Sequence, residues 1–223
     1  LANVSAAYAV YHGPEGLKRI ASKVNERTSS LAQSLTSAGF KLKSNNFFDT
    51  LVLNTKGNTS KYLKIALAKK INLRKIDSNN LGISLDETVT QNELEELMSV
   101  FVKNVNSKEI QSCKPSIPNN LVRKSEYLKH QVFHNYQSET GLMRYIKNLH
   151  DKDIALDRAM IPLGSCTMKL NSASEMIPIS WPKFSSIHPF APKNQVKGYT
   201  QLIEELENML AVITGYSKIS VQP

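Results

Sequence analysis

The residue types best suited to chemistry gather in one stretch, Met160–Asn171, which begins with apolar side chains and then places a glycine, two hydroxyls, a thiol and an ammonium within six residues. Gly164 gives backbone freedom, and the hydroxyls of Ser165 and Thr167 compete for backbone hydrogen bonds, so this composition favours a loop. A hydroxyl can hold a phosphate or carboxylate oxygen, and the ammonium of Lys169 can neutralise one. An ordered polar loop between apolar segments is typical of a binding site. The alternative is a structural loop whose hydroxyls bind their own backbone.

Other chemically capable side chains lie nearby or stand apart. Cys166 could be reactive, since Lys169 would favour its thiolate, but no base is assigned to it, and we favour a small buried apolar residue. His188 could approach the same pocket or be buried for structural reasons. His130 and His134 have the spacing of a helical metal-binding pair, but their segment has weak helix signals, so we expect no metal site.

Composition narrows the class of protein. The chain has 223 residues, a net charge of +9 and 41% hydrophobic residues, which is sufficient for a core. Two cysteines, Cys113 and Cys166, make a disulfide framework improbable and favour a reducing compartment. The sequence contains no run of about 18 apolar residues, so it predicts no membrane-spanning helix. Because Lys and Arg are spread along the chain, with a short dense run at Lys69–Lys75, a solvated surface is favoured over a nucleic-acid groove.

The first hundred residues carry regular helix and strand signals. Leu1–Tyr11 indicates the end of a packed helix, and Gly13–Gly16 places a proline in the first turn of a helix that Gly39 can end. The further elements that we expect are a strand over Phe47–Leu53, a helix from Ser60 to about Lys70, strands over Ile71–Lys75 and Leu81–Leu85, and a helix behind the capping box Thr90–Glu93. This order describes a compact α+β unit of about a hundred residues.

The signals fade from Cys113 to about Gln137, where prolines and asparagines indicate a linker. A helix is expected to begin near Ser138, with its inward side chains at Leu142, Tyr145, Ile146 and Leu149. Another helix is expected over Gln195–Thr214, ended by Gly215. Ile219–Val221 indicates a strand that enters a sheet, and because the sequence then stops, we expect the chain to be cut inside a domain.

Several short motifs of the sequence, in this order, resemble those of the glycine cleavage system P-protein family, whose cofactor is pyridoxal phosphate (PLP). They extend over nearly the whole chain, and several such motifs in the right order form a specific signal. The motifs are Ala9–Leu17, Phe47–Thr50, Leu81–Thr88, His130–Phe133, Ser138–Thr140, Met160–Asn171, Ile187–Phe190, Gly198–Tyr199 and Thr214–Tyr216.

The resemblance implies the fold and the domain organisation. The family has two homologous halves, each with an α/β fold of the PLP-dependent aminotransferase type (fold type I). Residues 1–20 would then end the large domain of the first half, and residues 21–110 would form its small α+β domain. Residues 111–140 would be a linker, and residues 141–223 would begin the domain of the second half.

The resemblance also implies the reaction, which is PLP-dependent decarboxylation of glycine. Carbon dioxide is released, and the aminomethyl group passes to the lipoyl arm of H-protein. PLP provides the electron sink, and the protein provides orientation and electrostatics. The implied partners are glycine, the lipoyl-bearing H-protein, and other P-protein chains in a homodimer or a two-half assembly.

For the site, the resemblance implies that Ser165 and Thr167 bind the cofactor and that Lys169 binds the substrate, and His188 is a further candidate for substrate binding. His188 would hold a carboxylate or stack on the pyridine ring. None of the lysines in the chain matches the family's Schiff-base lysine motif, so we name no catalytic residue and no metal ligand. The chain by itself is therefore expected not to decarboxylate glycine.

Two other functions stay open at this point. The chain could be a non-catalytic interaction or regulatory module that pairs with full-length P-protein, or a basic nucleic-acid binder with strongly salt-dependent affinity. For localisation, a eukaryote-like overall resemblance favours the mitochondrial matrix, and the alternative is the bacterial cytoplasm.

Overall fold

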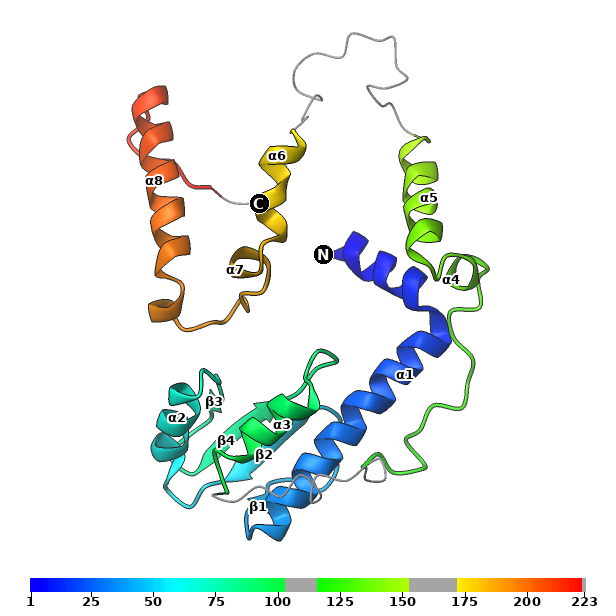
Figure 1. The fold of residues 1–223 in the computed structure, drawn as a ribbon, viewed down its shortest axis with the longest axis vertical. Coiled ribbons are helices and arrows are strands. Elements are labelled where there is room, and N and C mark those ends of the chain that lie inside the picture. The colour runs from blue at the N-terminus through cyan, green and yellow to red at the C-terminus, as the bar shows by residue number, and fades with distance from the viewer. Residues whose placement is uncertain (103–115, 153–171, 222–223) are drawn as a thin grey trace. The chain divides into compact units, whose positions relative to one another are not determined.

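The computed structural model describes residues 1–102, 116–152 and 172–221. It shows a mixed α/β protein with one small antiparallel sheet, which agrees with the expected fold class at that level (Figure 1). Contacts divide the chain into two compact units, Leu1–Ala159 and Met160–Pro223. In the parts of the chain that the structure describes, no helix is both long and apolar enough to cross a membrane.

The first element is α1, Ala2–Ser37, which is interrupted at Gly13. Gly13 has φ 61° and ψ −180°, a conformation open essentially to glycine alone. Pro14 has no N–H to donate and fits the first turn of the helix that follows, as the sequence predicts. Residues before Gly13 are helical too. Val10 is buried as the packed helix predicts, but Leu1 and Val4 are exposed, so the prediction is wrong for the start of the segment.

The sheet has the strand order β1–β2–β4–β3, and each neighbouring pair is antiparallel. The strands expected over Phe47–Leu53 and Ile71–Lys75 are shorter than predicted, and β1 was not predicted. The strands are β1 Lys41–Leu42, β2 Thr50–Asn54, β3 Arg74–Lys75 and β4 Asn80–Ser84. β2 and β4 align Leu51 with Ile83 and Leu53 with Leu81, so alternate residues of both strands point to one face.

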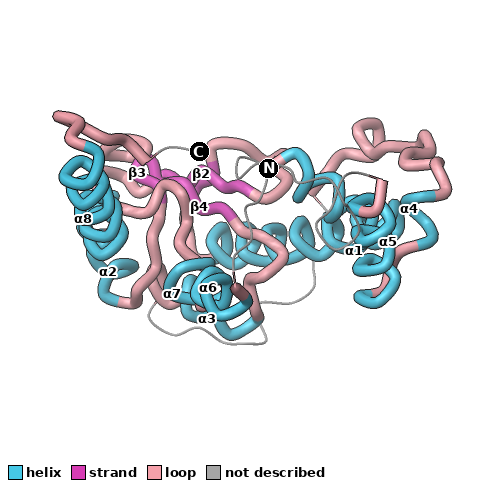
Figure 2. Tube along the Cα trace, turned by 90° about the horizontal axis from the view of Figure 1, so that it is seen from above, coloured by secondary structure: helices cyan, strands magenta, loops and turns pink. Residues whose placement is uncertain are grey.

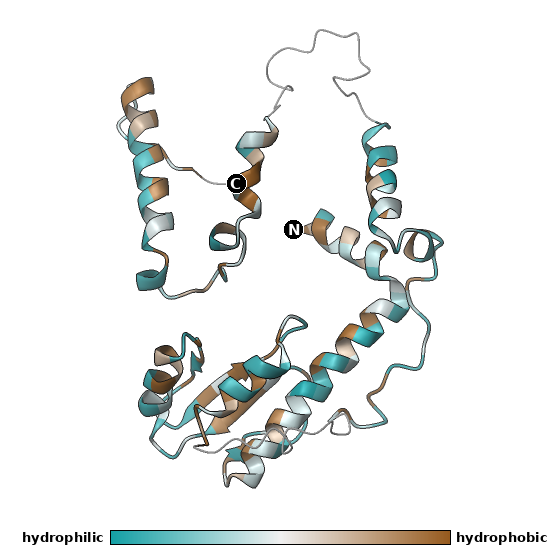
Figure 3. Cartoon of the chain, viewed as in Figure 1, coloured by the Kyte–Doolittle hydropathy of each residue, from teal (hydrophilic) through white to brown (hydrophobic). Residues whose placement is uncertain are grey.

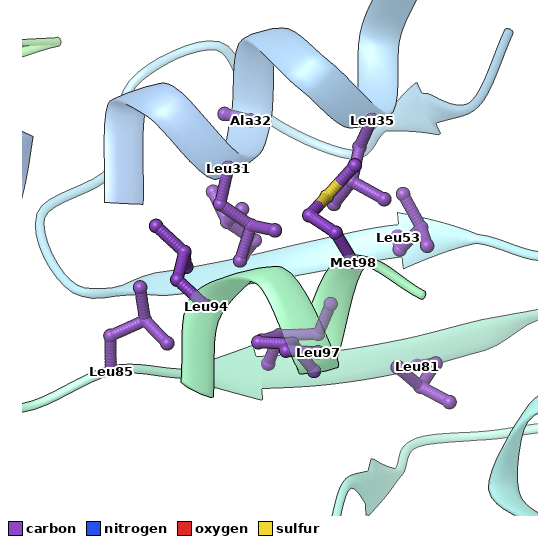
Figure 4. Close-up of a cluster of buried hydrophobic side chains, with 11 residues drawn as sticks. Leu31, Ala32, Leu35, Leu53, Leu81, Leu85, Leu94, Leu97 and Met98 are labelled. Atoms are coloured by element: carbon purple, nitrogen blue, oxygen red, sulfur yellow. The ribbon is translucent and has the colours of Figure 1, made fainter. Parts of the chain in front are cut away.

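That face of the sheet carries the core. α1 and α3, Gln91–Met98, lie on the same side of β2 and β4 (Figure 2). Each fully buried leucine stabilises the fold by roughly 1.5–3 kcal/mol relative to an exposed one. The cluster comprises Leu31, Ala32, Leu35, Leu51, Leu53, Leu81, Ile83, Leu85, Leu94, Leu97 and Met98 (Figure 4).

The N-termini of α3 and α2 show where local capping signals predict the start of a helix correctly and where they do not. At α3 the capping box is confirmed, because the Thr90 hydroxyl accepts from the Glu93 N–H and the Glu93 carboxylate accepts from the Thr90 N–H at 2.7 Å. At α2, Thr59–Ala68, Ser60 is not the cap as expected. Thr59 is buried instead, and its hydroxyl donates to the Ser78 carbonyl at 2.8 Å.

After the first described range come α4, Val132–Asn135, and α5, Glu139–His150. The start of α5 is confirmed, since the Ser138 hydroxyl accepts from the Gly141 N–H at 3.1 Å. Leu142 and Tyr145 are half-buried as expected, but Ile146 and Leu149 are exposed, so the prediction that they point inward is wrong.

The second unit is helical in its described residues. Its elements are α6 Ala173–Met176, the 3-10 helix η2 Ile177–Ser180, α7 Pro182–Ser185, the 3-10 helix η3 Lys193–Gln195 and α8 Lys197–Thr214. Gly215 ends α8 in the left-handed conformation, as predicted. The strand expected over Ile219–Val221 is wrong, because these residues have no strand pairing and Val221 N donates to Glu207 Oε1. Hydrophobic residues of α6 and α8 are visible in Figure 3, and many of this unit's large apolar side chains are exposed.

Candidate cofactor and substrate site

The structure describes one of the four predicted site residues. His188 lies between α7 and α8 in the second unit. Ser165, Thr167 and Lys169 lie outside the described residues, as does Cys166. The pocket that would bring these side chains together therefore stays a prediction.

His188 lies in a turn between α7 and α8 that several local contacts hold in place. The Tyr199 hydroxyl of α8 donates to the Phe184 carbonyl of α7, and the two rings are 5.8 Å apart between centroids. The Ala191 N–H donates to the His188 carbonyl at 2.9 Å, which closes a turn behind α7. The turn is thus held at its α7 end, at its α8 end and at His188 itself.

The imidazole of His188 is exposed and has a defined donor side. Its Nδ1 accepts a hydrogen bond from the Phe190 N–H at 3.0 Å. In the neutral ring Nδ1 is then unprotonated, so the proton is on Nε2. Nε2 is therefore a hydrogen-bond donor, and among the described residues no hydrogen bond occupies it. A carboxylate or a phosphate oxygen is the kind of partner that such a donor takes.

The sequence around His188 contains positively charged residues but no negatively charged ones. Residues 177–203 contain Lys183, Lys193 and Lys197 and no Asp or Glu. A positively charged segment of this kind attracts anions. The described donors therefore fit an anionic ligand such as the predicted cofactor or a substrate carboxylate.

The other histidines have structural contacts. His130 Nδ1 accepts from the Val132 N–H, and His134 Nε2 lies 3.0 Å from the Leu128 carbonyl oxygen. Both rings thus hold the turn before and within α4. Across the described ranges, no group of three or more metal-ligating side chains is found.

One buried polar network has no local signal in the sequence. Asn25, only 2% exposed, donates from Nδ2 to the Phe48 carbonyl at 2.8 Å and accepts at Oδ1 from the Ser116 N–H at 3.2 Å. The Ser116 hydroxyl in turn donates to the Phe47 carbonyl at 2.6 Å. Asn25 and Ser116 are 91 residues apart in the sequence, so this pairing ties the linker to α1 without any pattern that sequence analysis could detect.

A second contact joins α1 to the loop between β4 and α3. The Tyr8 hydroxyl donates to Glu87 Oε1 at 2.9 Å. Burial and this hydrogen bond together raise the pKa of Tyr8 above its ordinary value. The phenol therefore stays protonated and remains a donor at neutral pH.

Comparison with known proteins shows which family the chain resembles, which the geometry of the described residues does not show. Residues 1–101 match the family model described as glycine cleavage system P-protein. The whole chain aligns with the glycine dehydrogenase (decarboxylating) of Paraburkholderia phytofirmans at 47% identity over 234 residues. It also aligns with the proteins of the same name from Photobacterium profundum, at 50% over 229 residues, and Paraburkholderia xenovorans, at 47% over 234 residues. In each case the alignment covers 100% of this chain and 24% of the relative.

Fold and described site together define a mixed α/β protein with donors for an anionic ligand. By sequence it is a relative of the glycine cleavage system P-protein, and the comparisons confirm that resemblance. The chain spans about a quarter of the length of these curated relatives. The relatives named here are bacterial, and they give no support to the mitochondrial matrix as the location.

Proposed function

We propose that the chain forms part of a PLP-dependent glycine dehydrogenase (decarboxylating) of the glycine cleavage system. The observation that carries this proposal is the 47–50% identity to enzymes of that name along the entire chain. In the proposed reaction glycine loses its carboxylate as carbon dioxide, and the aminomethyl group passes to the lipoyl arm of H-protein.

Within that function, the second unit supplies binding groups rather than the reacting lysine. Ser165 and Thr167 hold the cofactor through their hydroxyls, and Lys169 and His188 hold the substrate carboxylate. The bound cofactor supplies the electron sink that makes loss of the carboxylate possible. His188 donates from Nε2, while its bond from Phe190 fixes the ring. The isolated chain has no matching Schiff-base lysine and is expected to be inactive.

We place this chain in fold type I, across the junction of two homologous halves. Residues 1–20 end the first large domain, 21–110 form the small domain, 111–140 link the halves, and 141–223 begin the second. The small antiparallel sheet with α1 and α3 on one side supports the assignment of the small domain. The proposed partners are glycine, H-protein and other P-protein chains, and the proposed compartment is the bacterial cytoplasm, because the relatives named above are bacterial.

The test replaces the matching quarter of the Photobacterium profundum enzyme with this chain and measures labelled carbon dioxide from carboxyl-labelled glycine. His188→Ala in this hybrid should raise the KM for glycine about tenfold or more, while His188→Gln, which keeps a donor, should recover part of the loss. Lys218→Ala, in the same unit and outside the predicted site, is the matched control. Equal KM values for His188→Ala and the control would contradict the assigned role.

A second candidate function is a non-catalytic module that pairs with full-length P-protein. The exposed apolar side chains of α8, among them Leu202, Leu206 and Met209, favour it. Copurification of the chain with full-length subunits of the Photobacterium protein would support this function, and a monodisperse monomer in their presence would contradict it.

A further inference from the structure

Two successive segments of the small domain carry opposite charge. Residues 41–75 contain nine Lys and Arg and one carboxylate, Asp49, and so have a net charge of +8. Residues 76–102 contain six Asp and Glu and no Lys or Arg. The basic residues were expected to be spread along a solvated surface, yet nine of the 28 Lys and Arg fall within residues 41–75.

The cations of residues 41–75 are accessible. All are exposed except Lys69, which is half-buried, and in the described part of the chain none has a carboxylate within 4 Å as an ion-pair partner. The set is Lys41, Lys43, Lys56, Lys61, Lys64, Lys69, Lys70, Arg74 and Lys75. We call it the basic set.

Sheet register places three members of the basic set on one face. Lys41 pairs with Asn54, and Arg74 pairs with Gly82, and both partners alternate with leucines that point to the core. Lys43 follows Lys41 at the same parity, and its N–H donates to the Val52 carbonyl. These side chains therefore lie on the face opposite the core, and Figure 2 shows α1 and α3 on the other side of the sheet.

We propose that this open face of the small domain, together with the rest of the basic set, docks a compact acidic segment of a partner protein. The exposed cations of the basic set create a positive potential that speeds the approach of an anionic partner by about tenfold to a thousandfold. The partner surface is expected to carry clustered Asp and Glu side chains.

The same domain argues against an extended polyanion. The six carboxylates of residues 76–102 include three on α3 and Asp77, which feels the charge of Lys43. They repel a long nucleic acid or an anionic membrane plane more than a compact acidic patch that contacts only a few of the cations. Eight of the nine cations are lysines, and none lies over an aromatic ring in the described cation–π contacts. Nucleic-acid grooves favour arginine and stacked aromatics instead.

The test measures binding of three probes to the full chain by fluorescence anisotropy at 20 mM and 200 mM NaCl. The probes are a labelled peptide with eight glutamates, a 20-base-pair DNA duplex, and vesicles that contain phosphatidylglycerol. The proposal expects saturable peptide binding at 20 mM that weakens at 200 mM by roughly tenfold or more. The triple variant Lys41→Gln/Lys43→Gln/Arg74→Gln should weaken peptide binding at 20 mM by at least about fivefold.

The matched control removes three exposed cations of α1, in Lys18→Gln/Arg19→Gln/Lys23→Gln, and should change peptide affinity less than about twofold. Equal losses in the two triple variants would overturn the location, since net charge alone would then explain binding. Tighter binding of DNA or vesicles than of the peptide, or no peptide binding at 20 mM, would overturn the partner class. Circular dichroism of both variants checks that the fold is retained.

Discussion

Replacing Gly13 by Ala should detach α4 from α1 while the core around β2 and β4 stays folded. The backbone at Gly13 lies in a region that costs other residues roughly 1–3 kcal/mol. A Cβ there would also lie 2.6 Å from the Phe133 carbonyl oxygen, and it would overlap the end of the Gln137 side chain. The Gln137 side chain can swing away, but the Phe133 backbone moves only if α4 moves.

These terms give an expected loss of about 3–5 kcal/mol in the local stability of the α1–α4 contact. The core lies on α1 well beyond the break, at Leu31 and Leu35, so it should not feel the change directly. Because about 1.4 kcal/mol is a factor of ten in an equilibrium constant, hydrogen exchange in residues 132–150 should speed up by at least a hundredfold. Exchange in β2 and β4 should change little.

A matched control is Gly39→Ala, which also has positive φ, at 86°, but has no atom within 4 Å of the added Cβ. It should cost only about 1–2 kcal/mol and leave residues 132–150 unchanged. Unaltered exchange in 132–150 of the Gly13 variant would refute the reasoning. So would an equal acceleration in β2 and β4, since that would mean global unfolding.

Three further changes test the small domain. Leu53→Ala should lower the free energy of unfolding by about 2–5 kcal/mol in urea titrations, and Leu67→Ala, at a 53% exposed position, by less than about 1 kcal/mol; similar losses would contradict the assigned core. Thr90→Ala should cost about 1 kcal/mol by removal of the α3 cap, measured in the same way, and no change would mean that the cap contributes nothing. Hydrogen bonds from Thr88 and from Thr90 lower the folded-state pKa values of Asp86 and Glu93 below 3.8 and 4.5. Both ionised carboxylates therefore stabilise the fold at neutral pH. The midpoint of thermal unfolding should stay constant from pH 7 to about 5 and fall as the pH drops below these ordinary pKa values. The double variant Asp86→Asn/Glu93→Gln should reduce this pH dependence.

Elements with local causes were predictable from the sequence. The Thr90 capping box and the left-handed Gly215 depend on a few neighbouring residues, and the structure has both. The two-residue strand β1 has no period to detect, and its pairing with β2 depends on distant residues. Ile146 and Leu149 show a further limit, because periodicity predicts an apolar stripe but not what covers it.

The candidate site was predictable only as residue types. His188 could be picked out as a polar residue among apolar neighbours, but its donor nitrogen follows from the Phe190 N–H, a feature of turn geometry. The Asn25–Ser116 pairing joins residues 91 positions apart, and no local pattern encodes it. Lys169 was chosen by resemblance, and it lies outside the described residues.

We propose that this chain forms part of a glycine-decarboxylating enzyme. The most direct measurement is the release of labelled carbon dioxide from carboxyl-labelled glycine by the Photobacterium profundum enzyme whose matching quarter is this chain, compared with the unaltered enzyme. We expect PLP-dependent release within about tenfold of that of the unaltered enzyme, and none from the isolated 223-residue chain. A folded, PLP-loaded hybrid that releases no carbon dioxide would contradict it.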